Sequence, residues 1–194
     1  PRPSQAKAVM KYFWDFNGGL GQTGLDLVQG AVLELSEYQW QNTGSNEAHL
    51  SLSYPAQVGA DLELADLLDF SLSFRWRVPG PDKDNRVAIT LGNEERESVI
   101  RLTTSQTRPS FQVENIGANL NLLPEAAQYR DDDWHSLVLA YDSYRQQVFY
   151  YLDGQLAGWA QAPRAWRQLS LSQLKIYAEN WGTDLDDLAI WQGT

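Results

Sequence analysis

Hydrophobic and polar residues alternate along several short stretches of the chain, and each stretch predicts a β-strand with one buried face. The clearest runs from residue 70 to 78, where every second residue is apolar: Phe70, Leu72, Phe74, Trp76 and Val78. Residues 135–142 and 148–152 show the same alternation on either side of a polar turn at 143–146. We expect these two stretches to pair as a hairpin.

Turn residues divide the rest of the chain into further short strands. The dipeptide Asp153-Gly154 favours a type I′ turn, so residues 155–161 are expected to return as the next strand. Other expected strands are 12–16, 87–91, 99–103, 110–113, 171–177 and 185–191. The best helical candidate, 62–68, is too short to carry a fold, and a weaker one lies at 124–128. This pattern predicts an all-β fold, a two-sheet antiparallel sandwich or jelly roll in residues 9–194, with 1–8 as an extension or linker.

Composition and charge narrow the possible partners. The 194 residues include 25 acidic and 15 basic side chains, a net charge of -10, which disfavours nucleic acid and anionic membrane surfaces. No apolar stretch approaches the roughly 20 residues needed to cross a bilayer. Cysteine is absent, which excludes disulfides and thiolate metal sites. No apolar signal core is present, so we expect the sequence to begin after a cleaved leader or within a longer protein.

Motifs of enzymes and nucleotide-binding proteins give little support to either class. Residues 19–24, GLGQTG, match the glycine spacing of a dinucleotide site, but no alternation of strands and helices follows. There is no Gly-x-Ser-x-Gly or His-Glu-x-x-His motif. His49 and His135 are expected to be ordinary strand residues, because no nucleophile or orienting carboxylate marks either one.

The acidic segment near the C-terminus has two interpretations. Asp184, Asp186 and Asp187 interrupt an otherwise apolar strand, and residues 15–19, DFNGG, offer further oxygen atoms if the first and last strands are neighbours. Calcium prefers such oxygen ligands. A loop of solvated acids explains the same residues, and their chemistry alone leaves both interpretations open.

The eight tryptophans and nine tyrosines are numerous for a chain of this length. Four of them are predicted beside turns or on the face of a strand opposite the core: Trp159, Trp166, Trp181 and Tyr151. Their rings could stack on sugars, although burial in the core or its rim is the ordinary fate of large aromatic side chains.

Five segments in the same order resemble laminin G-like, concanavalin A-like domains. Residues 133–142, DWHSLVLAYD, and 148–156, VFYYLDGQL, resemble the tryptophan strand and the Tyr-Val-Asp-Gly hairpin of that family. Residues 14–17, WDFN, 70–78, FSLSFRWRV, and 185–191, LDDLAIW, resemble its opening, middle and closing strands. The resemblance implies a jelly roll of two antiparallel sheets with a structural calcium. Its ligands would be Asp186, Asn17 and backbone carbonyls near Gly44, with Asn17 replacing the usual aspartate.

The same resemblance implies a non-catalytic function. Catalytic relatives carry a Glu-x-Asp-x-Glu strand that this chain lacks. We therefore expect a recognition module of an extracellular or cell-surface protein. Its expected ligand is a glycan or a surface protein, with carbohydrate as the first choice. We also expect it to be part of a larger protein. Arg75 and Arg77 could bind acidic sugars or form salt bridges with the surplus acids. The alternatives are a protein-binding or self-assembly module, and a glycoside hydrolase with atypical carboxylates.

Overall fold

The chain is described here from a computed structural model. The described residues are 8–16, 23–35, 39–42, 48–52, 57–67, 69–77, 86–93, 100–105, 110–112, 133–162, 169–178 and 183–193. Within these ranges every regular element is a β-strand, and no helix is long and apolar enough to cross a membrane.

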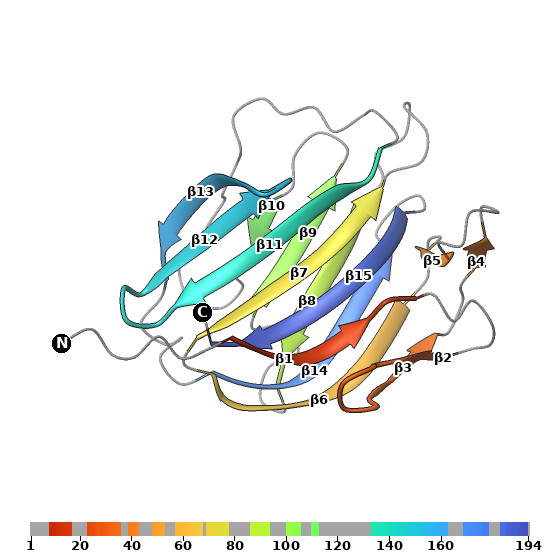
Figure 1. Cartoon of the computed structure of the whole chain (residues 1–194), viewed down its shortest axis with the longest axis horizontal. Coiled ribbons are helices and arrows are strands. Elements are labelled where there is room, and N and C mark those ends of the chain that lie inside the picture. Colours follow the sequence, from red (N-terminus) through yellow and green to blue (C-terminus); the bar gives the residue numbers. More distant parts are fainter. Residues whose placement is uncertain are drawn as a thin grey trace.

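The described strands form two antiparallel sheets that pack face to face (Figure 1). Sheet A contains, in spatial order, β13 (Gln155–Gln161), β12 (Gln147–Leu152), β11 (His135–Asp142), β7 (Phe70–Arg77), β15 (Thr183–Gln192), β5 (Ala48–Leu52) and β4 (Gln39–Asn42), with β1 (Val9–Trp14) also paired to β15. Sheet B contains β10 (Ser110–Gln112), β9 (Ile100–Ser105), β8 (Arg86–Gly92), β14 (Leu169–Ala178), β6 (Gln57–Leu67), β3 (Val32–Leu35) and β2 (Thr23–Leu25). The predicted two-sheet antiparallel sandwich is confirmed.

The core lies between the two sheets and is built from alternate residues of each strand. In β7, Phe70, Leu72, Phe74 and Trp76 are buried, as their spacing predicts. Leu72 lies opposite Leu139 of β11 on one side and Ile190 of β15 on the other. Both partners are buried, so one layer of the core crosses three strands that are far apart in sequence.

The predicted helix at residues 62–68 is wrong, because this segment belongs to the long strand β6. Val58, Ala60, Leu62 and Leu64 are buried, whereas Gln57, Asp61 and Glu63 are exposed. This period of two begins before residue 62 and is the pattern of a strand. Pairing with β14 then satisfies the backbone of β6. The weaker helical candidate at 124–128 lies outside the described residues.

The predicted hairpins are confirmed, and their turns are fixed by side chains. Asp153 and Gly154 have φ angles of 49° and 75°, which a type I′ turn requires. The Asp153 carboxylate accepts a hydrogen bond from the Ser136 backbone N–H at 2.8 Å. Its other oxygen lies 2.9 Å from Nδ1 of His135, so the turn is tied to the start of β11.

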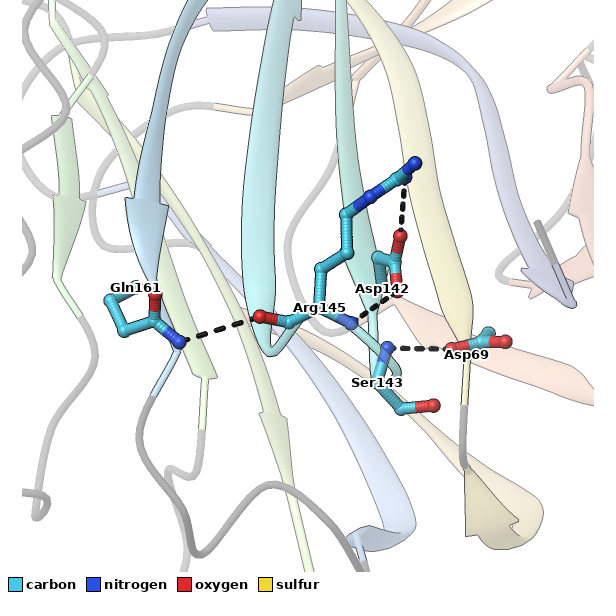
Figure 2. Close-up of polar contacts among 5 residues, drawn as sticks. All are labelled: Asp69, Asp142, Ser143, Arg145 and Gln161. Atoms are coloured by element: carbon cyan, nitrogen blue, oxygen red, sulfur yellow. Dashed lines mark hydrogen bonds and ion pairs between the residues drawn. The ribbon is translucent and has the colours of Figure 1, made fainter.

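The turn between β11 and β12 is held by a second group of polar contacts, and Figure 2 shows those among Asp69, Asp142, Ser143, Arg145 and Gln161. Asp142 accepts hydrogen bonds from the backbone N–H and the guanidinium of Arg145, each at 2.8 Å. Asp69 accepts one from the backbone N–H of Ser143 at 2.7 Å. The side-chain amide of Gln161 donates to the carbonyls of Arg145 and Gln146, at 3.4 and 2.8 Å. These contacts join β7, β11 and β13 at one end of sheet A.

The first and last strands are neighbours, as the calcium interpretation requires. β15 pairs with β7 along one edge, and its other edge is shared by β5, at residues 183–185, and β1, at residues 188–192. Between these two partners, the register with β7 shifts at Asp186 and Asp187. Asp187 has a φ of 51°, so the strand bulges where the two carboxylates lie.

Candidate functional site

The outer face of sheet A, away from the core, carries an unusual set of side chains. Antiparallel sheets that face water normally present polar residues there. Strand register places two adjacent rows of six residues across this face. The first row is Trp159, Phe149, Ala140, Ser71, Trp191 and Met10, and the second is Leu156, Tyr151, Val138, Ser73, Ala189 and Phe13. We call these twelve residues the aromatic face.

Exposure and size vary in an ordered way across the aromatic face. Trp159 and Leu156, on the edge strand β13, have exposed fractions of 56% and 54%. The other members are partly exposed, except for Ala189, which is buried. Large side chains occupy the two sides: both rows on β12, β13 and β1, and the first row alone on β15, where Trp191 is followed in the second row by the small Ala189. Small ones, Ser71 and Ala140 among them, occupy the centre.

The aromatic face carries no charged side chain, although the chain has a net charge of -10. The strands β12 and β13 together contain no charged residue, and the turn between them contributes only Asp153. Charge borders the face at its two ends, at the Asp142–Arg145 turn and at a cluster around Arg75, and at its β1 edge, where Lys11 follows Met10. An uncharged outer sheet face with exposed aromatic side chains is a candidate binding surface.

The cluster at one end of the face is built around Trp134, which precedes β11. The guanidinium carbons of Arg75 and Arg77 each lie 5.1 Å from the centroid of the Trp134 ring. The ring of His49 meets the same indole edge to face, with centroids 5.4 Å apart. Two cations on one aromatic ring hold Trp134 against sheet A.

Both arginines of this cluster are also ion-paired. Of the two roles expected for them, binding of acidic sugars or salt bridges with the surplus acids, the structure shows the second. Nε and Nη2 of Arg77 donate to Oδ2 of the buried Asp184, at 3.0 and 2.6 Å. The same oxygen lies 3.4 Å from Nε2 of His49. Nη1 of Arg75 lies 3.8 Å from Asp186 and 3.5 Å from Asp187. The positive charge is therefore already balanced by neighbouring carboxylates.

Asp186 lies at the bulge of β15, between β1 and β5, and is buried. Burial raises the pKa of its carboxyl group to about 7, and the negative charges of Asp187 and Asp15 act in the same direction. A hydrogen bond from the Asp187 backbone N–H, at 2.9 Å, and the charge of Arg75 oppose this rise. When Asp186 is ionised, Arg75 and the Asp187 backbone N–H therefore do not fully offset its burial and the negative charges of Asp187 and Asp15.

The fit of this region to calcium rests on oxygen chemistry. Asp186, Asp187 and Asp15 are carboxylates near the β1–β15 junction, and Asp186 is affected by the charge of both others. Within the described ranges, no three acidic or histidine side chains are grouped tightly enough to hold a metal ion. The other two predicted ligands, Asn17 and Gly44, lie outside the described residues. Of the three predicted ligands, the described residues include only Asp186, a buried carboxylate.

The structure brings together some of the predicted binding residues and separates others. Trp159 and Tyr151 lie on adjacent strands of the aromatic face, whereas Arg75 and Arg77 lie at its charged end. Trp166 and Trp181 lie outside the described residues. His49 and His135 are both strand residues, on β5 and β11. Residues 19–22 of the glycine-rich motif also lie outside the description, and Gly24 belongs to β2.

Sequence reasoning missed several members of the site. Phe149, Trp191 and Phe13 each occupy the outward parity of their strands, a signal that could have identified them one by one. Met10 has the parity of the buried Tyr12 and Trp14, and only the bulge between Met10 and Tyr12 brings it to the outer face. Their assembly into one surface depends on strand order, because β1, β7, β11 and β15 come from distant parts of the chain. Trp134 was missed because it precedes a strand and carries no periodic signal.

Comparison with known proteins places the chain among lectin-like folds. Residues 38–194 match a laminin G family model described as the concanavalin A-like lectin/glucanases superfamily. The fold is similar to the botulinum neurotoxin serotype D binding domain, with a TM-score of 0.72 and 13% identity over 95% of this chain and 48% of that chain. A comparison with curated proteins gives no match.

Two further structures of the same kind were solved with bound partners. The binding domain of botulinum neurotoxin DC in complex with SialylT has a TM-score of 0.71 and 12% identity. The same domain in complex with rat synaptotagmin II has a TM-score of 0.70 and 13% identity. Each match covers 95% of this chain and 48% of the other, so the chain spans about half the length of these neighbours.

Proposed function

The chain belongs to the concanavalin A-like lectin/glucanases superfamily, and on this premise we propose that it is a non-catalytic recognition module that binds carbohydrate. The observation that carries the proposal is the aromatic face of sheet A. Trp159 is more than half exposed there and lies directly opposite Phe149 on the next strand. Large aromatic side chains are normally mostly buried, so an exposed tryptophan beside further rings indicates a binding surface.

Carbohydrate is the ligand that suits this surface best. A sugar ring has an apolar face that stacks on an aromatic side chain and hydroxyl groups at its edge that need hydrogen-bond partners. The aromatic face supplies rings in Trp159 and Phe149, and hydroxyls in Tyr151, Ser71 and Ser73. Rings for apolar contact and hydroxyl groups for hydrogen bonds are the two kinds of group that a sugar needs.

The arrangement of carboxylates supports binding without catalysis. A glycosidase needs two carboxyl groups that reach the bond to be cleaved, one of them as a proton donor. On the outward face of β15, Asp184 and Asp186 are both buried, with exposed fractions of 3% and 6%. Asp184 is further engaged by Arg77 and His49. Neither side chain is free to act on a sugar lying on the aromatic face.

A structural calcium beside Asp186 is the second part of the proposal. Asp186 would hold the ion, with Asn17 and carbonyl groups near Gly44 completing the oxygen set. The ion would supply the positive charge that the buried carboxylate lacks and would link the first and last strands. Support comes from the β1–β15 pairing and from the raised pKa of Asp186 beside Asp187 and Asp15.

Titration calorimetry with calcium tests this part. Wild-type protein should bind calcium, and chelator should lower its unfolding temperature. Asp186→Asn should bind calcium at least tenfold more weakly, because an amide is a poorer ligand than a carboxylate. Asp61→Asn, which changes an exposed acid on sheet B, is the matched control and should bind as the wild type does. Equal binding by Asp186→Asn and wild type would contradict the site.

A glycan array tests the carbohydrate proposal. The wild-type chain should bind a defined group of sugars, and Trp159→Ala should lose that binding because the most exposed ring of the face is removed. Tyr144→Ala is the control, since Tyr144 is 86% exposed but lies in the turn outside the aromatic face. A blank array, or equal binding by Trp159→Ala, would contradict the proposal.

A protein-binding or self-assembly module is the second candidate, favoured by the exposed Leu156 and Trp159 on an edge strand. Light scattering across a range of concentrations would detect self-association. Growth of the measured mass with concentration, and its loss in Trp159→Ala, would favour this candidate over the lectin. In either case we propose an extracellular or cell-surface location, which the family and the toxin binding domains support.

A further inference from the structure

We propose that the ligand of the aromatic face is an uncharged, linear oligosaccharide that lies across the strands, from Trp159 on β13 to Trp191 on β15. This inference rests on the proposed carbohydrate function and adds the class of glycan, its direction and its minimum length. The five observations that carry it are the register of the rows, the small residues at their centre, the tryptophan at each side, the absence of charge and the paired state of the neighbouring arginines.

The two tryptophans lie in one lateral row. Trp159 is opposite Phe149, Phe149 is opposite Ala140, Ala140 is opposite Ser71, and Ser71 is opposite Trp191. The row therefore crosses four strand-to-strand steps, or about 19 Å at about 4.8 Å for each step. A monosaccharide or disaccharide can contact one side only. A chain of several sugar units is needed to reach both.

The residues between the two sides leave room for such a chain. Ala140 and Ser71 in the first row, and Val138 and Ser73 in the second, are smaller than the rings that flank them. All four are partly exposed, so solvent reaches the centre of the face. The serine hydroxyls can donate and accept hydrogen bonds with sugar hydroxyls, while the flanking rings pack against sugar faces.

The electrostatics favour an uncharged sugar over an acidic one. No member of the aromatic face can neutralise a carboxylate or sulfate group, and the chain carries a net charge of -10. Arg75 and Arg77, at the charged end of the face, are already paired with Asp184, Asp186 and Asp187. Lys11 lies at the edge of the face, at the bulge of β1 next to Met10. An acidic sugar at the centre of the face, over β11 and β7, would lose its hydration without gaining a countercharge from these arginines.

Calorimetric titration with linear oligosaccharides of two to six units tests the inference. The neutral probes are oligomers of glucose, mannose, galactose and N-acetylglucosamine, and oligogalacturonate is the acidic probe. For at least one neutral series, the affinity should rise at least tenfold from the dimer to the length that reaches both tryptophans, and then level off. Oligogalacturonate should bind at least tenfold more weakly. Equal affinity for dimer and hexamer, or preference for the acidic series, would overturn the inference.

Variants on the two sides separate this inference from the proposed function. Trp191→Ala should reduce hexamer affinity at least tenfold, toward that of the dimer, whereas Trp159→Ala should weaken both. Ser71→Leu places a larger side chain at the centre of the first row and leaves both tryptophans intact. It should also reduce only the hexamer affinity. This variant guards against misfolding of Trp191→Ala, and Tyr144→Ala is the unaffected control.

Three patterns of result distinguish carbohydrate binding in general from binding at the extended site that reaches both tryptophans. Loss in Trp159→Ala with no change in Trp191→Ala and Ser71→Leu would overturn the extended site and leave carbohydrate binding standing. No binding of any sugar series would overturn both. Binding of a protein partner that is lost in Trp159→Ala, Trp191→Ala and Ser71→Leu alike, with no sugar binding, would assign the face to protein recognition and overturn the glycan.

Discussion

For individual side chains at the site, residue type alone predicts some properties, and the fold determines the rest. The segment around Asp186 was recognised as a place where charge needs a partner, because carboxylates interrupt an apolar strand. The structure adds that Asp186 is buried, lies at a bulge and has a pKa raised to about 7. Burial at the junction of β1, β5 and β15 depends on contacts between distant segments, so local sequence could not reveal it.

Asp186 gives a prediction about the metal-free protein. Its pKa is about 7 in the folded state against an ordinary value of 3.8. Between these values the folded protein retains a proton that the unfolded chain has lost, so stability should fall as pH rises from about 4 to about 7. In chelator, Asp186→Asn should remove this dependence and be more stable at pH 8, by up to about 4 kcal/mol at about 1.4 kcal/mol for each pKa unit. Urea unfolding at several pH values measures it.

The result would count against the burial of Asp186 in two cases. One is an Asp186→Asn protein whose stability falls with pH as steeply as that of the wild type. The other is a variant less stable than the wild type at pH 8 in chelator. Asp187→Asn is the comparison. Because Asp187 is only partly buried, this substitution should change the pH dependence of stability less than Asp186→Asn does.

The two arginines illustrate a different limit of sequence interpretation. Their alternation in β7 placed them correctly on the outward face, opposite the core. Their contacts with Trp134 and with the acids of β15 could not be predicted, because Arg77 and Asp184 are 107 residues apart in sequence. Parity identifies the face on which a side chain lies, whereas its partner depends on strand order.

At the scale of elements, strands with a full run of alternation were identified almost to the residue. The expected strand 135–142 is β11 itself, and 155–161 is β13. Residues 62–68 were wrongly predicted as a helix because seven residues are too few to show whether the apolar period is that of a helix or of a strand. Leucines at 62 and 64 fit a strand, but their acidic and alanine neighbours also suit a helix, and the burial of Val58 and Ala60 decides the matter.

Alanine substitutions along β6 should show a period of two. Leu62→Ala and Leu64→Ala should each lower the free energy of unfolding by about 2–5 kcal/mol, because both leucines are in the core. Asp61→Ala and Glu63→Ala, which change exposed side chains, should each cost under about 0.5 kcal/mol. Denaturant unfolding provides the measurement. A small effect at Leu64 would contradict the strand.

The turn between β12 and β13 gives a second prediction for an element. Asp153→Asn keeps a residue that tolerates positive φ and should cost under about 1 kcal/mol, reflecting the weakened contact with His135. Asp153→Val places a β-branched side chain in that conformation and should cost more, on the order of 2 kcal/mol. Thermal unfolding compares the two. Equal stability of the variants would show that the turn does not hold this geometry.

At the scale of the whole molecule, the sandwich is predictable from the sequence, whereas only part of the proposed binding surface is. Trp159 and Tyr151 are predicted as exposed platforms because they lie near turns or on outward parity, and the structure places both on the outer face of sheet A. The opposite side of the surface comes from β1 and β15, and the centre comes from β7 and β11. Only the order of strands in sheet A brings these four segments beside β12 and β13 (Figure 1).

The order of strands also separates two regions with different tasks. The uncharged rows across the middle of sheet A are suited to a ligand. The charged cluster of Trp134, Arg75, Arg77 and Asp184 closes one end of the face with contacts among its own members. The Asp142–Arg145 turn borders the other end. The surface that we propose for recognition lies between them.

The most direct test of this account is a map of ligand contacts on the intact chain. Isotope-labelled protein would be titrated with the strongest sugar from the array, and nitrogen–proton NMR spectra would follow each backbone amide. The account predicts that the largest shifts fall on β11, β12, β13 and β7, with a second group on β15 near Trp191. Shifts confined to sheet B, or to residues outside the aromatic face, would contradict the assignment of carbohydrate recognition to sheet A.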